Sequence, residues 1–319
     1  MKLGVLFVCA AVAACGQDAA WLRLIDQGRA LELSGDYGET VTVYQEALKV
    51  AESTNDQLLP YTLNLLATAY DASGQPLEAE KRYRRAMAIL ETTRGKETAN
   101  YATLLANLAG NYADRSRAAE SEALLHEAMA IFDRTVAPYD TRFQQARNSL
   151  AVLLLGRGHY QEAELLLVQV LDNCRKHPEP GSVLEAVALD NLGVIRRNQG
   201  RQEDSVRLIE QSVAFFEGAV GPRHPLLLYP LNNLATAYAK VGRREEAEAL
   251  FHRVLTIAET RLGTGHPTYG SLLLNYSGFL RFAGRKKEAK KLETQARAVL
   301  RDHRLSTGAG MTIDVSAFH

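Results

Sequence analysis

Histidines, cysteines and carboxylates, the side chains that most often carry out catalysis or bind metals, are scattered in this sequence without a spacing typical of either. It contains no GxxxxGK[ST] phosphate loop, no GxSxG nucleophile motif and no HExxH zinc motif. Cys174 has no His/Cys neighbours spaced for zinc, and its position in VLDNCRKH is typical of a packing residue. The sequence therefore predicts a protein that is not an enzyme and that uses no metal and no cofactor.

The charge balance argues against nucleic acid as a partner. The 319 residues include 37 basic and 37 acidic side chains, so the formal net charge is zero. Binding to phosphates needs a basic excess or a basic stripe, whereas basic clusters here, such as GRKKEAKK, stand beside acids. Such mixed clusters are typical of solvated helix faces.

The first twenty residues indicate an export signal. An apolar run from Leu3 to Ala14 follows a single lysine and is too short to span a bilayer as a helix. It ends in VAAC at Cys15, which resembles the lipobox of bacterial lipoproteins, where the cysteine is lipidated. The alternatives are cleavage by an ordinary signal peptidase, after Ala13 or Ala20, and an uncleaved apolar helix. The first two interpretations imply a secreted or periplasmic protein, anchored to the membrane if Cys15 carries lipid.

A repeat of 42 residues organises the rest of the chain. In each unit an acid lies four residues after a marker position, a small residue lies five after it, and another small residue lies seven before it. Bulky apolar residues surround these columns at helical spacing, which predicts a helix, a tight turn and a second antiparallel helix in each unit. Stacked units bury one continuous core. The marker positions are Gly35, Gly74, Ser116, Gly158, Gly200, Gly242 and Gly284.

Departures from the repeat are also informative. The pairs His224–Pro225 and His266–Pro267 lie 42 residues apart between units, and we expect them to begin the next helix, because proline suits a first helical turn. In the last unit Glu293 and Arg297 replace apolar residues, as a terminal capping helix requires. Arg196 stands where other units carry tyrosine, so it either covers the core with its stem or contacts a partner.

The stretch LNNLATAYAKVGRREEAEALFHRVLTIAETRLGTGHP, residues 231–267, resembles a tetratricopeptide repeat of the 42-residue kinesin-light-chain type. The likeness covers about residues 21–303. It implies an all-α fold, a right-handed α-solenoid of about seven antiparallel helix-turn-helix repeats over residues 21–305. Residues 1–20 are then the signal, and residues 306–319 form a tail that we expect to be flexible. Proteins of this family serve as protein-interaction scaffolds.

The resemblance places the first helix of each hairpin along a concave groove. Nine residues before the marker position, four of the seven repeats carry asparagine, at Asn107, Asn191, Asn233 and Asn275. Asn64, Asn148 and Asn232 stand one residue earlier in their repeats. An amide both donates and accepts hydrogen bonds, so such a row can hold the backbone of an extended peptide. The alternative is that these asparagines serve only neighbouring segments of the repeat.

Three basic residues extend the expected groove site. Arg197, Lys240 and Arg281 lie two or three residues before the marker glycine and favour an acidic peptide or a C-terminal carboxylate. The sequence thus predicts a non-catalytic protein–protein interaction scaffold of the bacterial cell envelope, which binds an extended peptide or protein in its concave groove. The alternatives are a cytoplasmic regulatory adaptor, if the N-terminus is not processed, and an accessory subunit of an enzyme.

Overall fold

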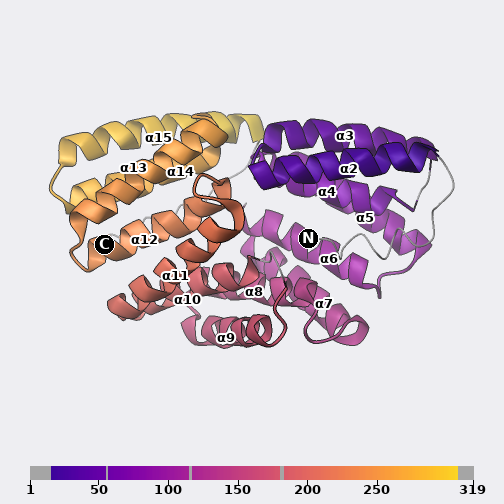
Figure 1. The fold of residues 1–319 in the computed structure, drawn as a ribbon, viewed down its shortest axis with the longest axis horizontal. Helices are drawn as coiled ribbons and strands as arrows, with labels where there is room; N and C mark the ends of the chain where they lie inside the picture. The colour runs from indigo at the N-terminus through magenta and orange to yellow at the C-terminus, as the bar shows by residue number, and fades with distance from the viewer. Residues whose placement is uncertain (1–15, 55–56, 115–116, 180–182, 308–319) are drawn as a thin grey trace.

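The protein is an array of antiparallel helix pairs (Figure 1). The computed structural model describes residues 16–54, 57–114, 117–179 and 183–307, and within these ranges every regular element is helical. The α-helices pair into seven hairpins in chain order, and a 3₁₀ helix, η1 (Pro225–Leu227), precedes α12. The expected α-solenoid is confirmed. The pairs are α2 (Gly16–Ser34) and α3 (Tyr37–Thr54), α4 (Leu59–Ala72) and α5 (Pro76–Thr93), α6 (Ala99–Asp114) and α7 (Ala118–Thr135), α8 (Thr141–Gly156) and α9 (Tyr160–Lys176), α10 (Leu184–Asn198) and α11 (Gln202–Val220), α12 (Leu228–Lys240) and α13 (Arg244–Arg261), and α14 (Pro267–Phe282) and α15 (Lys286–Thr307).

The marker glycines end the first helix of each hairpin. Gly242 has φ +84°, in the left-handed region that favours glycine, and the N–H of Arg243 donates to the carbonyl of Tyr238 at 2.9 Å. This bond reaches back across the last helical turn and reverses the chain, as in a Schellman motif. The other five marker glycines also have φ between +77° and +83°. Ser116 lies outside the described residues.

The second helix of each hairpin begins with an acid where the sequence expected one. Each of these helices carries its column acid in the first turn, where a carboxylate opposes the positive end of the helix dipole. The residues are Glu39, Glu78, Glu120, Glu162, Asp204, Glu246 and Glu288.

The small residues seven positions before the markers lie where the two helices of a hairpin approach each other. A Cβ atom built on Gly28 would lie 2.1 Å from Cε1 of Tyr44, and one built on Gly193 would lie 2.5 Å from Cγ1 of Ile209. Tyr44 and Ile209 are completely buried. Close packing therefore explains why this column contains only small side chains.

The two His–Pro pairs begin the first helices of the last two hairpins, as expected. The Nδ1 atom of His224 accepts a hydrogen bond from the N–H of Leu226 at 3.1 Å, and Nδ1 of His266 accepts one from Thr268 at 3.2 Å. Each histidine is thus a side-chain N-cap, and the following proline occupies the first helical position.

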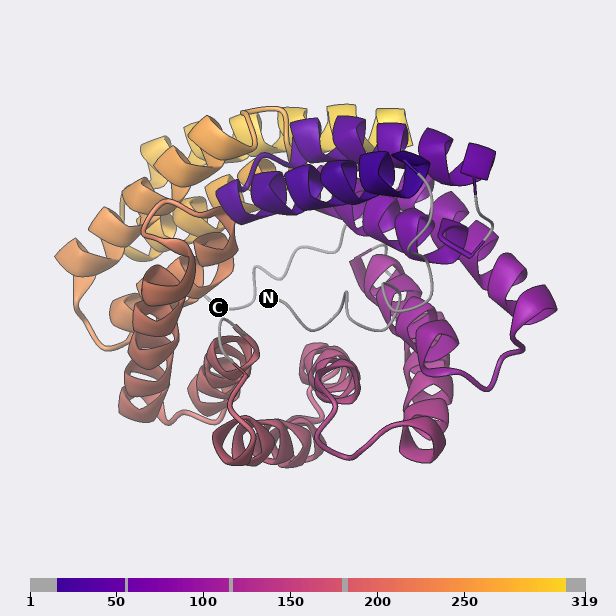
Figure 2. The ribbon, with the colours of Figure 1, turned by 45° about the vertical axis from the view of Figure 1, so that its right-hand side comes forward.

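The hairpins follow a curved course in which the first helices lie inside. Successive first helices from α4 to α14 contact each other directly, which places them on the shorter, concave side of the curve. The curvature is strong enough that the hairpin α2–α3 lies beside the C-terminal hairpins in both views (Figures 1 and 2). The concave side is therefore surrounded by the chain.

Two segments identified in the sequence fall largely outside the described ranges. Residues 1–15, with Cys15, and residues 308–319 are not among the described residues. Residues 16–20, which we expected in the signal, form the first turns of α2, and α15 continues to Thr307. Within the described ranges, no helix combines the length and the apolar character that a membrane span requires.

Replacing Gly28 with alanine tests the close approach of the helices. Gly28→Ala should lower the free energy of unfolding, because the added Cβ collides with the buried Tyr44 ring. We expect this collision to outweigh the helix propensity of alanine, which is more favourable than that of glycine by about 1 kcal/mol. The control is Gly110→Ala in α6, where nothing lies within 4 Å of the added Cβ, and it should be stabilising. Urea unfolding measures both. Stabilisation by both substitutions would contradict this account of the packing.

Candidate peptide-binding surface

The asparagines of the expected groove bind one another across successive hairpins. Nδ2 of Asn107 donates to Oδ1 of Asn64 at 2.8 Å, and Nδ2 of Asn191 donates to Oδ1 of Asn148 at 3.1 Å. Asn275 donates to Asn232 in the same way at 3.2 Å. Each bond joins residues 43 positions apart, one repeat plus one residue. We call these inter-helix pairs the rungs of a ladder.

The two residues of each rung are matched in their hydrogen-bonding groups. Where the later residue is an asparagine, the earlier residue is a hydrogen-bond acceptor. In the same two sequence columns, Ile25 takes the earlier position where Leu65 takes the later one, and Ala106 takes the earlier position where Ser149 takes the later one. An unsatisfied buried amide costs about 1–3 kcal/mol, so asparagine stands at the later position where the earlier residue can accept its N–H.

The amides retain hydrogen-bonding capacity beyond the rungs. Asn107, Asn191, Asn233 and Asn275 are half-buried, so water or a ligand reaches part of each side chain. Each rung uses one N–H of the later amide, which leaves its second N–H and its carbonyl oxygen. The structural role and the binding role weighed for these residues are therefore compatible.

One rung contains a carboxylate in place of an amide. Nδ2 of Asn233 donates to Oδ2 of Asp190 at 2.9 Å, while Oδ1 of Asp190 is buried without a hydrogen bond. Burial raises the pKa of this carboxyl to about 6, against the opposing effects of the Asn233 hydrogen bond and the charge of Arg197. Asp190 was not among the candidate residues. Its position in the column of Asn64, Asn148 and Asn232 was the signal that could have identified it.

The three basic candidates have different surroundings. Arg281 forms a two-bond ion pair with Glu293 of α15, at 2.5 and 2.8 Å, so its charge is compensated within its own hairpin. Arg197 acts electrostatically on the buried Asp190. Lys240 is exposed at the end of α12 and makes no ion pair with any described residue. Of the three, Lys240 is thus the cation best placed to meet a partner.

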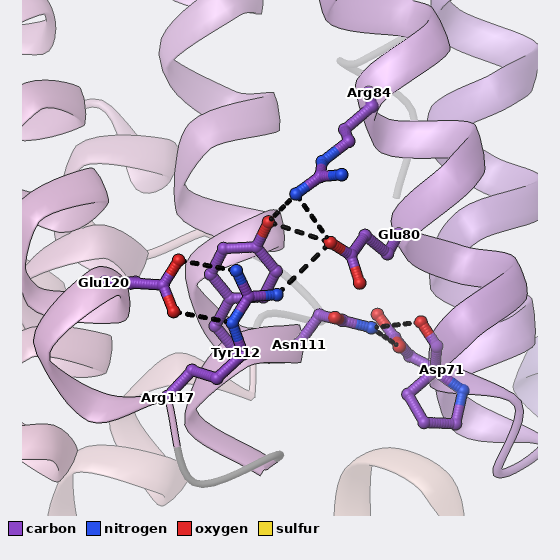
Figure 3. Close-up of polar contacts among 8 residues, drawn as sticks. Asp71, Glu80, Arg84, Asn111, Tyr112, Arg117 and Glu120 are labelled. Atoms are coloured by element: carbon purple, nitrogen blue, oxygen red, sulfur yellow. Dashed lines mark hydrogen bonds and ion pairs between the residues drawn. The ribbon is translucent and has the colours of Figure 1, made fainter. Parts of the chain in front are cut away.

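A second set of polar contacts joins neighbouring hairpins away from the rungs (Figure 3). The guanidinium of Arg117 lies 3.6 Å from the centre of the Tyr112 ring and binds Glu80 of the preceding hairpin at 3.2 Å. The Tyr112 hydroxyl donates to the same carboxylate at 3.0 Å, and Arg84 pairs with it at 2.8 Å. Arg117 also binds Glu120 of its own hairpin at 2.7 Å. The cluster therefore ties α5 to α6 and α7.

The arrangement recurs along the array, which indicates a structural role. Arg243 lies 3.7 Å from the centre of the Tyr238 ring and binds Glu210 at 3.2 Å. In the fifth hairpin Arg196 takes the place of tyrosine and binds Glu164 of the fourth hairpin at 2.7 Å. Arg196 is therefore engaged within the chain, on the same inter-hairpin seam.

The described residues contain little that could perform chemistry. No group of three or more His, Cys, Asp or Glu side chains in these ranges is arranged to hold a metal ion. Cys174 is half-buried against the apolar core of the fourth and fifth hairpins, and burial raises the pKa of its thiol, which disfavours the reactive thiolate.

The carboxylate rung should make stability depend on pH. The folded chain holds the Asp190 proton more tightly than the unfolded chain, so its contribution to the free energy of unfolding is largest below pH 3.8 and falls as pH rises through about 6. Asp190→Asn recreates the amide rungs and should gain up to about 3 kcal/mol relative to wild type between pH 4 and pH 7.5. Urea unfolding at both values measures this gain.

The reciprocal variant is the control for that measurement. Asn148→Asp places a carboxylate in the equivalent rung of the fourth hairpin, where the residue is also buried. It should lose stability at pH 7.5 and recover at pH 4. If Asp190→Asn kept the pH dependence of the wild type, the carboxyl would not titrate as its burial implies.

Comparisons with known proteins agree with this architecture. A family model described as tetratricopeptide repeat matches residues 18–92, 184–260 and 226–302, and a second model of that description matches residues 102–136 and 144–177. No curated protein matches the sequence.

Several solved structures share the fold. The Rap conjugation gene regulator of plasmid pLS20, in complex with the Phr* peptide, has a TM-score of 0.71 at 13% identity over 94% of this chain and 80% of its own. A Rap protein complexed with Competence and Sporulation Factor has a TM-score of 0.66 at 15% identity over 95% and 92% of the two chains. BtubC from P. vanneervenii has a TM-score of 0.52 at 20% identity over 72% and 92%. These identities establish similarity of fold alone.

The family models cover most of the chain, and the ranges that they match contain the helical hairpins of the structure. The chain belongs to the tetratricopeptide repeat family.

Proposed function

We propose that this protein is a non-catalytic scaffold that binds an extended peptide, or an extended segment of a partner protein, on its concave side. The observation that carries the proposal is the ladder of half-buried amides on the inner helices, which offers donors and acceptors at a regular spacing. A peptide backbone presents N–H and C=O groups regularly, so an amide row can bind it with little dependence on sequence.

The fold comparison supports the same mode of binding. The Rap regulator of plasmid pLS20, which shares this fold over nearly the whole chain, was solved in complex with a peptide. A structure similar in curvature and length can hold a ligand of that kind. The likeness of fold does not specify the ligand, which depends on the side chains of this chain.

Charge on the concave side favours a carboxylate near the sixth hairpin. Lys240 is exposed and has no acidic partner among the described residues, whereas Arg281 is compensated by Glu293. We therefore propose that the bound segment places an acidic side chain or its C-terminal carboxylate at Lys240. An exposed ion pair contributes at most about 1 kcal/mol, so this contact selects among peptides that the amides bind.

Paired substitutions test the groove without unfolding it. Asn148→Ile together with Asn191→Leu converts one rung to the residue types found at Ile25 and Leu65, so neither amide remains unsatisfied. Peptides selected on an array with the wild type should bind this variant about tenfold more weakly, because at least one hydrogen bond is lost. Unchanged affinity in a folded variant would contradict the groove as the binding surface.

The charge is tested separately with matched lysines. Lys240→Glu should weaken binding of acidic peptides roughly fivefold and leave neutral peptides unaffected. The control is Lys49→Glu, which makes the same charge change at an exposed position of α3, a second helix. Equal effects of both substitutions would indicate long-range attraction in place of a contact at Lys240.

We propose further that the protein acts in the bacterial cell envelope, attached through lipid on Cys15. The support is the apolar segment that ends at Cys15, in the sequence alone. Intact mass of the membrane-purified protein checks it: loss of the first fourteen residues with a diacylglycerol adduct supports the anchor. An unprocessed N-terminus would favour the cytoplasmic adaptor.

A further inference from the structure

The first hairpin contacts a loop that lies between four and five repeats farther along the chain. Nε2 of His224 lies 3.3 Å from the carbonyl oxygen of Glu32, across 192 residues. Nδ1 of His224 accepts the N-cap hydrogen bond from Leu226, so the ring proton lies on Nε2, which donates to Glu32. His224 is 5% exposed, and burial lowers its pKa, which keeps the ring neutral and in this tautomer.

The backbone approaches closely at the same place. A Cβ atom built on Gly35, in the turn of the first hairpin, would lie 2.4 Å from Cδ of Pro225. Glycine is therefore needed at this turn for two reasons, its φ of +77° and its contact with the distant loop.

The same contact recurs one repeat farther on. A Cβ atom built on Gly74, in the turn of the second hairpin, would lie 3.0 Å from Nε2 of His266 and 3.2 Å from Cδ of Pro267. At the marker glycines of the four later repeats nothing lies within 4 Å of such an atom. The sequence contains three His–Pro pairs. The two that cap the start of a helix receive a turn, whereas His177–Pro178 follows the end of α9. Matching pairs of contacts indicate a docking geometry that follows the symmetry of the solenoid.

We infer that the solenoid is held closed by an intramolecular latch, in which the turns at Gly35 and Gly74 dock on the His224–Pro225 and His266–Pro267 loops. The latch limits how far the concave side can open, because it joins the two ends of the curve. Its release allows the hairpins to spread while each one stays folded, since the apolar core clusters of the described residues join neighbouring hairpins and none of them joins the first two hairpins to the last two. This inference does not depend on the identity of any ligand.

A pair of glycine substitutions tests the latch. Gly35→Ala introduces a Cβ into the space of Pro225, and Gly158→Ala, at φ +80° with nothing within 4 Å, imposes the same backbone strain without a contact. We expect Gly35→Ala, and not Gly158→Ala, to increase the radius of gyration in small-angle X-ray scattering. It should also make amide hydrogen exchange several-fold faster at residues 221–227, far away in the sequence. Equal scattering and equal exchange at 221–227 in the two variants would overturn the latch.

A histidine substitution separates the latch from the helix cap. His224→Asn keeps a good N-cap residue and removes the ring nitrogen that reaches Glu32. We expect faster exchange at residues 32–36 with little change in thermal unfolding of the hairpins. Wild-type exchange at residues 32–36 in this folded variant would show that the bond does not hold the ends together.

Discussion

The close approach of the two helices within each hairpin is the constraint on which the other contacts depend. A small residue seven positions before the turn lies against a large buried side chain nine positions after it, as Gly28 lies against Tyr44 and Gly193 against Ile209. This approach fixes the angle and the rotation of the two helices. Because the hairpins share this close approach, they present similar faces to their neighbours, and stacking can repeat.

The contacts between neighbouring hairpins give the array its curvature. The amide rungs join first helices on the inside, and the Tyr–Arg–Glu clusters join the second helix of one hairpin to both helices of the next. These polar contacts are directional, so they specify the rotation from one hairpin to the next more narrowly than apolar packing alone. The same asparagines therefore determine the shape of the concave side and supply the groups through which we propose that it binds a peptide.

The rotations between successive hairpins add up until the turns of the first two hairpins contact the two His–Pro loops. The His–Pro loops cap the helices that follow them and also receive the turns of the first two hairpins, so one pair of residues acts in local and distant contacts. A small change of rotation at each interface moves the ends by a large distance, since the changes add along the array. The distant contacts are accordingly the part of the structure most sensitive to changes at any single rung.

Periodicity in the sequence was sufficient to determine the hairpins, their turns, the acids that begin the second helices and the two helices that begin at a His–Pro pair. Each of these contacts joins residues within one repeat, and helical spacing places such residues together with no knowledge of the rest of the chain. The tertiary structure alone decided that Asn107 binds Asn64, that Arg117 binds Glu80 and that Asp190 is buried beside Asn233. The contact between His224 and Glu32 also depends on the tertiary structure alone. It requires the rotations between several successive hairpins to add up to the right total, and the sequence of a single repeat does not specify that total.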